Sequence, residues 1–126
     1  MNECFRLFVY GHLRRGQVGH ALLGLETKTL WLGTAQVHGL LYDLGDYPGL
    51  ILGGRKVVHG ELISFDDPSL WSLLDDYENC DPKNPAASEY RRLEIDAVGG
   101  GARAWTYVYN LATADRPVIA SGIWQP

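Results

Sequence analysis

Residues 4–11 read Cys4-Phe5-Arg6-Leu7-Phe8-Val9-Tyr10-Gly11 and alternate between two faces. Phe5, Leu7 and Val9 fall on the same face, as every second residue does in an extended strand. Gly11 ends the run, because glycine permits a sharp change of chain direction. We therefore predict a first strand that ends in a tight turn.

The rest of the chain contains one short helix-like segment and several strand-like segments. Within residues 17–25, apolar side chains recur at helical spacing, at Val18, Ala21, Leu22 and Leu25. The strand-like segments are residues 29–44, followed by a turn signal from Gly45 to Gly49; residues 50–52 and 56–65, predicted as a hairpin around Gly53-Gly54; and residues 90–98 and 102–109, predicted as a hairpin around Gly99 to Gly101. Antiparallel strands dominate, which predicts one α+β domain over residues 1–126.

The composition limits the classes of function. The chain has 126 residues, 46% of them hydrophobic, and a net charge of −4, which disfavours binding to a nucleic-acid backbone. The sequence shows neither a bilayer-spanning run nor a signal-peptide pattern, so we expect a cytoplasmic protein without a membrane partner. Cys4 and Cys80 are expected to be free thiols. The four histidines lack metal-ligand spacing, so no metal site is predicted.

The segment after Asp67-Pro68 is predicted to be the main helix, over residues 69–79. Asp67 offers a capping carboxylate, and Pro68 suits the first turn because its missing N–H costs nothing there. On a helical wheel the apolar arc contains Leu70, Trp71, Leu73, Leu74 and Tyr77. This arc is expected to face the core.

Glu78 falls near ~80° on this wheel, inside the apolar arc, whereas Asp75 falls near ~140° and Asp76 near ~240°. Glu78 is therefore the one acid of this turn that we expect to point inward. A carboxylate at the edge of an apolar face loses hydration, which raises its pKa toward the range useful for proton transfer. The wheel alone favours a structural alternative, in which Glu78 caps a loop or pairs with Arg91 or Arg92.

The turn after the first strand has two interpretations. Gly11, His12 and Leu13 offer N–H groups that suit a small anion or an oxyanion and need no cofactor. An ordinary strand-to-helix turn accounts for the same pattern. Gln17 stands where a phosphate loop requires lysine, so nucleotide binding is not predicted.

Six stretches, in order along the chain, resemble a known family. They are Phe8-Val9-Tyr10-Gly11-His12-Leu13-Arg14-Arg15-Gly16, Leu41-Tyr42-Asp43-Leu44-Gly45-Asp46-Tyr47-Pro48-Gly49, Gly60-Glu61-Leu62, Leu74-Asp75-Asp76-Tyr77-Glu78, Tyr90-Arg91-Arg92 and Ala104-Trp105-Thr106-Tyr107. Together they resemble the γ-glutamylcyclotransferase-like family, including its AIG2-like and γ-glutamylamine cyclotransferase branches. The resemblance implies a small mixed, mostly antiparallel β-barrel with helices packed outside and a pocket at one end.

The resemblance also assigns residues. The family's Tyr-Gly-Ser/Thr-Leu substrate loop falls on Tyr10, Gly11, His12 and Leu13, and its catalytic glutamate falls on Glu78. The chain departs from the family pattern at His12, which changes the side chain beside the substrate and so bears on substrate preference.

Two tyrosines complete the predicted site, and the residue after the glutamate is a second departure from the family pattern. Tyr90 and Tyr107 are candidate hydrogen-bond partners of the substrate or of the glutamate, with an ordinary place in a strand as the alternative. Asn79 replaces the small residue that usually follows the glutamate, and asparagine tolerates the left-handed geometry of a helix end.

The implied reaction is an intramolecular cyclisation of a small γ-glutamyl amine or amide. Glu78 takes a proton from the α-ammonium group, the amine attacks the δ-carbonyl, and Glu78 returns the proton to the leaving amine, which gives 5-oxoproline. No metal or nucleotide cofactor is required. Two alternatives stay open: a non-catalytic module that binds a carboxylate-bearing metabolite, and a structural interaction domain.

Overall fold

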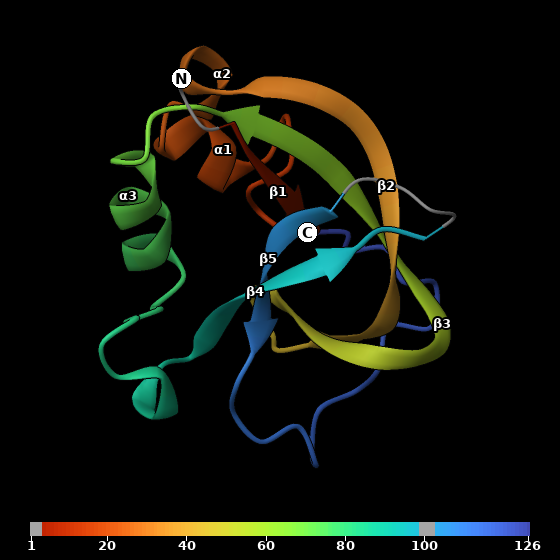
Figure 1. The fold of residues 1–126 in the computed structure, drawn as a ribbon. Helices are drawn as coiled ribbons and strands as arrows, with labels where there is room; N and C mark the ends of the chain where they lie inside the picture. Colours follow the sequence, from red (N-terminus) through yellow and green to blue (C-terminus); the bar gives the residue numbers. More distant parts are fainter. Residues whose placement is uncertain (1–3, 99–102) are drawn as a thin grey trace.

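The first strand lies at the centre of the fold. A computed structural model describes residues 4–98 and 103–126 and contains a five-stranded sheet in the order β2-β3-β1-β5-β4 (Figure 1). The strands are β1 (Phe5–Val9), β2 (Leu30–Asp43), β3 (Pro48–Phe65), β4 (Tyr90–Asp96) and β5 (Arg103–Tyr109). β1 pairs antiparallel with β3 and parallel with β5. The mixed α+β class predicted from the sequence is confirmed.

The alternation in β1 separates two apolar cores. Leu7 and Val9 belong to one core, which also contains Leu70 and Leu74. Phe8 belongs to the other core, which β2 and β3 enclose. Both faces of β1 are therefore covered, and the side chains from Leu7 to Val9 are at most 3% exposed.

The turn signal at residues 45–49 is confirmed, but the hairpin predicted around Gly53-Gly54 is wrong. β2 and β3 form one long antiparallel hairpin whose turn lies between Asp43 and Pro48. Residues 50–52 and 56–65 belong to the same strand, and both pair with β2. The register shifts where Gly39 pairs with Leu52 and the adjacent His38 pairs with Val57, so residues 53–56 bulge out of the ladder. The two glycines have φ of +112° and +81°, which suits a bulge as well as a turn.

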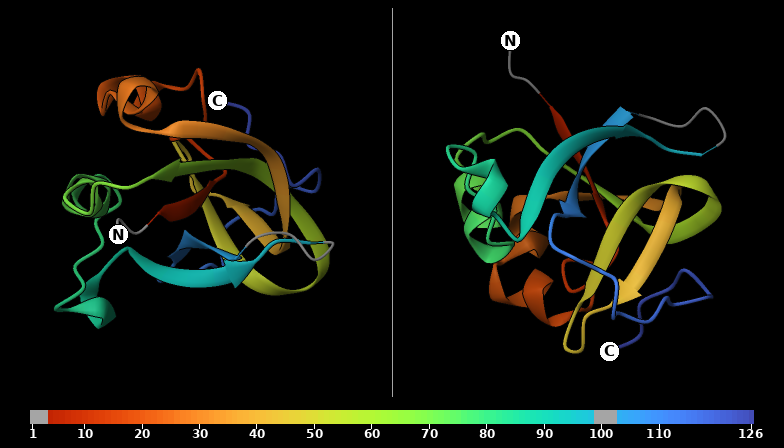
Figure 2. Two further views of the ribbon diagram at one scale, coloured as in Figure 1. Left: turned by 45° about the horizontal axis from the view of Figure 1, so that its top comes forward. Right: turned by 90° about the horizontal axis from the view of Figure 1, so that it is seen from below.

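The sheet is strongly curved but has two edges. β2 and β3 bend together over the second core (Figure 2). β2 and β4 are the terminal strands of the sheet order, and Val98 N–H, just beyond β4, donates a hydrogen bond of 2.8 Å to Gln36 O in β2. This bond joins the two edges at one point, and the strand ladders of the described residues do not close into a barrel.

The helices are short and lie together on the side of the molecule opposite the bend of β2 and β3 (Figures 1 and 2). They are α1 (Val18–Leu22), α2 (Leu25–Lys28), α3 (Leu70–Tyr77) and a 3-10 turn at Pro85–Ala87. No helix within residues 4–98 and 103–126 is long and apolar enough to cross a membrane.

The single helix predicted over residues 17–25 is divided by Gly24, whose φ is +65°. Val18 and Leu22, which the spacing places on the inner face, are 63% and 72% exposed, whereas His20 and Leu25 are buried. The helical period is confirmed, but the residues that mark it do not all form a buried face, because periodicity does not say which side of a helix its neighbours cover.

The hairpin predicted over residues 90–109 is confirmed, since β4 and β5 pair antiparallel from Tyr90 opposite Tyr109 to Asp96 opposite Arg103. The turn expected at Gly99 to Gly101 lies outside the described residues.

Candidate active site

The sequence fixes both ends of α3. Asp67 Oδ1 accepts hydrogen bonds from Ser69 N at 2.9 Å and Ser69 Oγ at 2.7 Å, so it caps the chain as it enters the helix. At the other end Asn79 has φ of +52°, a left-handed conformation that asparagine tolerates. The helix ends at Tyr77, and Glu78 occupies the C-cap position between the helix and Asn79.

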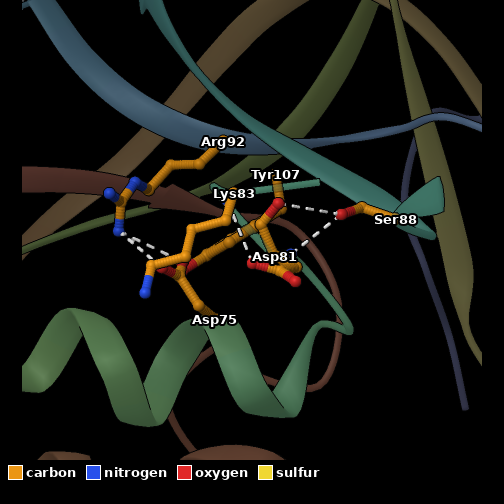
Figure 3. A network of polar contacts seen from close by, with 6 residues as sticks. All are labelled: Asp75, Asp81, Lys83, Ser88, Arg92 and Tyr107. Atoms are coloured by element: carbon orange, nitrogen blue, oxygen red, sulfur yellow. Dashed lines mark hydrogen bonds and ion pairs between the residues drawn. The ribbon is translucent and has the colours of Figure 1, made fainter. Parts of the chain in front are cut away.

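The prediction that only Glu78 of this turn points inward is wrong, because Asp75 is 7% exposed. Arg92 Nη1 donates hydrogen bonds of 3.1 Å to each oxygen of Asp75, and Tyr107 Oη donates one of 2.7 Å to Oδ1 (Figure 3). The guanidinium of Arg92 also stacks over the ring of Trp71, 4.2 Å from its centre. Arg92 belongs to β4 and Tyr107 to β5. These two strands therefore cover the side of α3 that carries Asp75, which the wheel placed outside the apolar arc.

This ion pair decides against the structural alternative for Glu78. Arg92 is held by Asp75, and the side chain of Glu78 has no hydrogen bond or ion pair with the described residues. Burial raises the pKa of Glu78 to about 8, and the negative charge of Glu89 acts in the same direction. Among the described residues, Glu78 is thus a carboxyl group without a hydrogen-bond or ion-pair partner, and its raised pKa favours the protonated form near neutral pH.

A pocket of about 210 Å³ lies beside Glu78. The residues predicted for the site all line it: Tyr10, Gly11, His12, Leu13, Glu78, Tyr90 and Tyr107. The sequence analysis missed the remaining walls, formed by Phe8, Val9, Tyr47, Pro48, Tyr77, Asn79 and Glu89. Within the described chain no lysine or arginine lines this pocket, so the donors it offers to an anion are backbone N–H groups and the side chains of His12, Tyr77 and Asn79.

In the loop from Gly11 to Leu13, the backbone C=O groups and the backbone N–H groups differ in their hydrogen bonding. The carbonyl oxygens of all three residues accept hydrogen bonds from Arg14 or His20. In the described chain, none of their three N–H groups donates a backbone hydrogen bond or one to a side chain. The three residues that carry these donors line the pocket.

Three of the lining tyrosines, Tyr10, Tyr90 and Tyr107, have hydroxyl groups that are already engaged. Tyr10 donates to Tyr107 O at 2.6 Å, and Tyr90 donates to Pro48 O at 2.6 Å. Tyr107 donates to Asp75, so its hydroxyl is directed at the ion pair and not at Glu78. Burial raises the pKa of each of these three hydroxyls. With their protons committed, Tyr10 and Tyr90 present only oxygen lone pairs to further partners.

Gly11 is required by a neighbour within the protein. A β-carbon at this position would lie 2.9 Å from Cγ of Pro48. Pro48 belongs to the confirmed turn signal and lines the same pocket. Gly11 therefore lets the loop approach the β2–β3 turn, and this close contact shapes the pocket.

Glu89 forms part of the pocket wall beside Glu78. Tyr47 Oη donates a hydrogen bond to Glu89, and Asn79 Nδ2 donates one of 3.1 Å to its other oxygen. The bond from Tyr47 raises the pKa of that tyrosine to about 12. Sequence gave no signal for Glu89, because its position depends on how the loop at residues 79–88 folds back beside α3.

The described residues contain no group of three or more His, Cys, Asp and Glu side chains arranged to hold a metal ion.

Comparison with known proteins agrees with this geometry. The family described as γ-glutamyl cyclotransferase, AIG2-like, matches residues 7–126. A putative γ-glutamylcyclotransferase of Vibrio cholerae is 36% identical over 118 residues, covering 94% of this chain and 93% of its own. The solution structure of ytfP from Escherichia coli superposes with a TM-score of 0.67 at 32% identity, covering 95% of this chain and 96% of the other. The γ-glutamylaminecyclotransferase of Rattus norvegicus is 30% identical, covering 85% of this chain and 78% of its own.

The chain therefore belongs to the AIG2-like γ-glutamyl cyclotransferase family. Members of this family are enzymes that catalyse an intramolecular cyclisation.

Proposed function

We propose that this protein converts a small γ-glutamyl amine or amide into 5-oxoproline and a free amine, with Glu78 as general base and then general acid. The observation that supports this most directly is a carboxyl group in the pocket wall that has no partner in the described part of the chain and has a pKa raised to about 8. A proton-transfer group works best when its pKa lies near the working pH. The named relative in Rattus norvegicus, a γ-glutamylaminecyclotransferase, supports an amine as leaving group.

The proposed steps balance without an added reagent. Glu78 as carboxylate takes a proton from the α-ammonium group, and the freed amine forms a bond to the δ-carbon of the same molecule. The bond from this carbon to the leaving amine breaks as Glu78 returns the proton to the departing nitrogen. Because nucleophile and electrophile belong to one molecule, the enzyme needs chiefly to fold the substrate into a ring-closing shape.

The polar groups of the pocket suit the two charges of a γ-glutamyl group. The unpaired N–H groups from Gly11 to Leu13 are donors for the α-carboxylate or for the oxyanion that develops at the δ-carbonyl. The hydroxyl oxygens of Tyr10 and Tyr90, whose protons are donated elsewhere, are acceptors for the α-ammonium. We assign Tyr107 a position in the wall, because its hydroxyl bonds to Asp75.

The raised pKa of Glu78 is compatible with its role as base. A positively charged ammonium group bound beside a carboxyl group lowers the pKa of that carboxyl. Binding of the substrate would therefore shift Glu78 toward the carboxylate form in the complex in which that form is needed.

The experiment is a panel of γ-glutamyl amines and γ-glutamyl amino acids incubated with the purified protein, with 5-oxoproline measured by mass spectrometry. We expect product from at least one amine or amide. If no member of the panel gives 5-oxoproline, the proposed reaction is wrong. Thermal stabilisation by these compounds without turnover would instead identify a binding module.

Two finer predictions accompany the proposal. Closure of the curved sheet into a barrel rests on the family resemblance, supported by the single bond between Val98 and Gln36. A cytoplasmic location rests on the sequence pattern alone, and fractionation of cells that express the protein would test it.

A further inference from the structure

We propose that Arg14 and His20 are positioning residues that turn the backbone of the Gly11–Leu13 loop so that its N–H groups face the pocket. This inference rests on the proposed function, in which those N–H groups bind the negative oxygens of the substrate. The two side chains lie outside the set that lines the pocket, so they would act through the loop and not on the substrate.

All three carbonyl oxygens of the loop accept hydrogen bonds. Gly11 O accepts hydrogen bonds from Arg14 N and Arg14 Nε, both at 3.1 Å. His12 O accepts from His20 N at 3.0 Å. Leu13 O accepts from His20 Nδ1 at 2.9 Å. A carbonyl oxygen cannot donate, so Nδ1 of His20 carries the proton in this contact.

A peptide unit is planar, with its C=O and N–H pointing in opposite directions. The carbonyl of Leu13, held by His20 Nδ1, shares its peptide unit with Arg14 N–H, so the His20 side chain fixes the backbone donor to Gly11 O. Fixing the carbonyls of Gly11 and His12 in turn fixes the N–H groups of His12 and Leu13, which belong to the same two peptide units. Those N–H groups have no partner within the described chain, although their carbonyls have one or two. The loop is thus held from the carbonyl side, and its donors are left for the pocket.

Both positioning side chains are themselves well fixed. His20 is 6% exposed, and Leu13, whose carbonyl it holds, is 3% exposed. Arg14 is half-buried, and its Nη2 donates a hydrogen bond of 2.6 Å to Trp124 O near the end of the chain. Desolvation lowers the pKa of Arg14. Rigid supports of this kind suit a donor array, because preorganised donors need not reorient as charge develops.

Gly19 explains how α1 comes close enough for this contact. A β-carbon at Gly19 would lie 2.9 Å from His12 O and 2.6 Å from the hydroxyl oxygen of Tyr77. Glycine at this position therefore lets α1 approach the loop, so that the adjacent N–H of His20 reaches His12 O.

Two pairs of variants test the proposal, and each pair differs by one donor. His20→Leu removes the donor, whereas His20→Asn has nearly the same shape and places an amide N–H close to the position of Nδ1. Arg14→Met removes the donor at the Nε position, whereas Arg14→Gln retains an N–H there. Leu22→Ser, on the 72% exposed position of the same helix as His20, is the control.

The first measurement does not depend on turnover. In ¹H–¹⁵N spectra, we expect 5-oxoproline, a carboxylate probe, to shift the amide signals of Gly11, His12 and Leu13 in the wild type and in Leu22→Ser. We expect these shifts to be lost in His20→Leu and Arg14→Met and to be restored in the Asn and Gln variants. A wild-type loop that does not respond to the probe, or Leu and Met variants that respond as the wild type does, would overturn the proposal.

The second measurement is kcat/KM with a substrate found by the panel assay. We expect a loss of about tenfold or more in His20→Leu and Arg14→Met, smaller than the effect of deleting a catalytic donor, with most of it restored by Asn and Gln. Equal activity within each pair of folded variants would overturn the proposal. If one Leu or Met variant does not fold, the pair at the other position decides. If no panel member is turned over, the proposed reaction fails, and the spectra still test the loop.

Discussion

Asp75 and Glu78 lie three residues apart on the same helix turn, and their surroundings are opposite. Asp75 is buried against Arg92 and Tyr107, which satisfy its oxygens with charge-assisted or strong hydrogen bonds. Glu78 lies on the pocket side, without a hydrogen-bond or ion-pair partner among residues 4–98 and 103–126, and beside a second acid, Glu89. Burial alone therefore does not make a carboxylate reactive. A paired carboxylate stabilises the fold, whereas an unpaired one is available for proton transfer.

The largest expected effect is on turnover, from Glu78→Gln. This change keeps the shape of the side chain and removes the proton-accepting oxygen, so we expect kcat to fall about 10³-fold. The rate of 5-oxoproline formation from the best substrate of the panel measures it. Asp76→Asn, an exposed acid in the same turn, is the matched control and should remain within about twofold of the wild type. Full activity in Glu78→Gln would remove Glu78 from the mechanism.

The next effect is on stability, from Asp75→Asn. The substitution leaves the guanidinium of Arg92 without its counter-ion, and the two side chains are only 23% and 10% exposed, so we expect a loss of about 2 to 3 kcal/mol in the free energy of unfolding. Urea denaturation measures this loss. The control is Asp96→Asn, which breaks an ion pair with Arg103 whose side chains are 60% and 72% exposed, and it should cost less than about 0.5 kcal/mol. Equal losses would show that the Asp75 pair is no more than a surface contact.

The third prediction concerns the pH dependence of stability. The folded state raises the pKa of Glu78 to about 8, so between the unfolded pKa and pH 8 the folded state binds more protons than the unfolded state. The wild type should therefore lose stability as pH rises through this window, by about 1.4 kcal/mol for each pH unit between the two pKa values. Glu78→Gln cannot titrate, so its stability relative to the wild type should increase from pH 5 to pH 9. Parallel stability curves for the two proteins would contradict a raised pKa at Glu78.

The smallest expected effect is on the pH profile of kcat/KM. Glu89→Gln removes a negative charge that raises the pKa of Glu78, so the rise of kcat/KM with pH should move to lower pH. Tyr47→Phe removes the hydrogen bond to Glu89 without changing the charge, and it is the control for a loss of local packing. If both variants move the profile equally, the effect of Glu89 is structural and not electrostatic.

Local sequence patterns predicted several elements correctly. The alternation in residues 4–10, the turn signal at residues 45–49 and the strands around residues 90–109 all depend on neighbours close along the chain. The wheel also placed the inward arc of α3 correctly at Leu70 and Leu74, which are buried. The pocket residues came from the family resemblance, and the structure brings them around one cavity.

The errors have one physical cause. Gly53-Gly54 satisfies a bulge and a hairpin turn equally well, and only pairing with β2 selects the bulge. Asp75 is buried because Arg92 and Tyr107 form hydrogen bonds to it. Leu73, on the predicted inner arc, is 37% exposed. In each case the observed conformation or burial depends on contacts with residues that are distant along the chain.

The sequence by itself determined the periods of the strands and helices, the positions of the main turns, and the presence of a glutamate at the end of α3. The tertiary contacts determine that Asp75, and not Glu78, pairs with an arginine. They also determine which backbone groups of the Gly11–Leu13 loop have no hydrogen-bond partner within the described chain. The reason is that backbone propensity and hydrophobic period are local properties, whereas desolvation and ion pairing depend on the chain segments that fold against the helix.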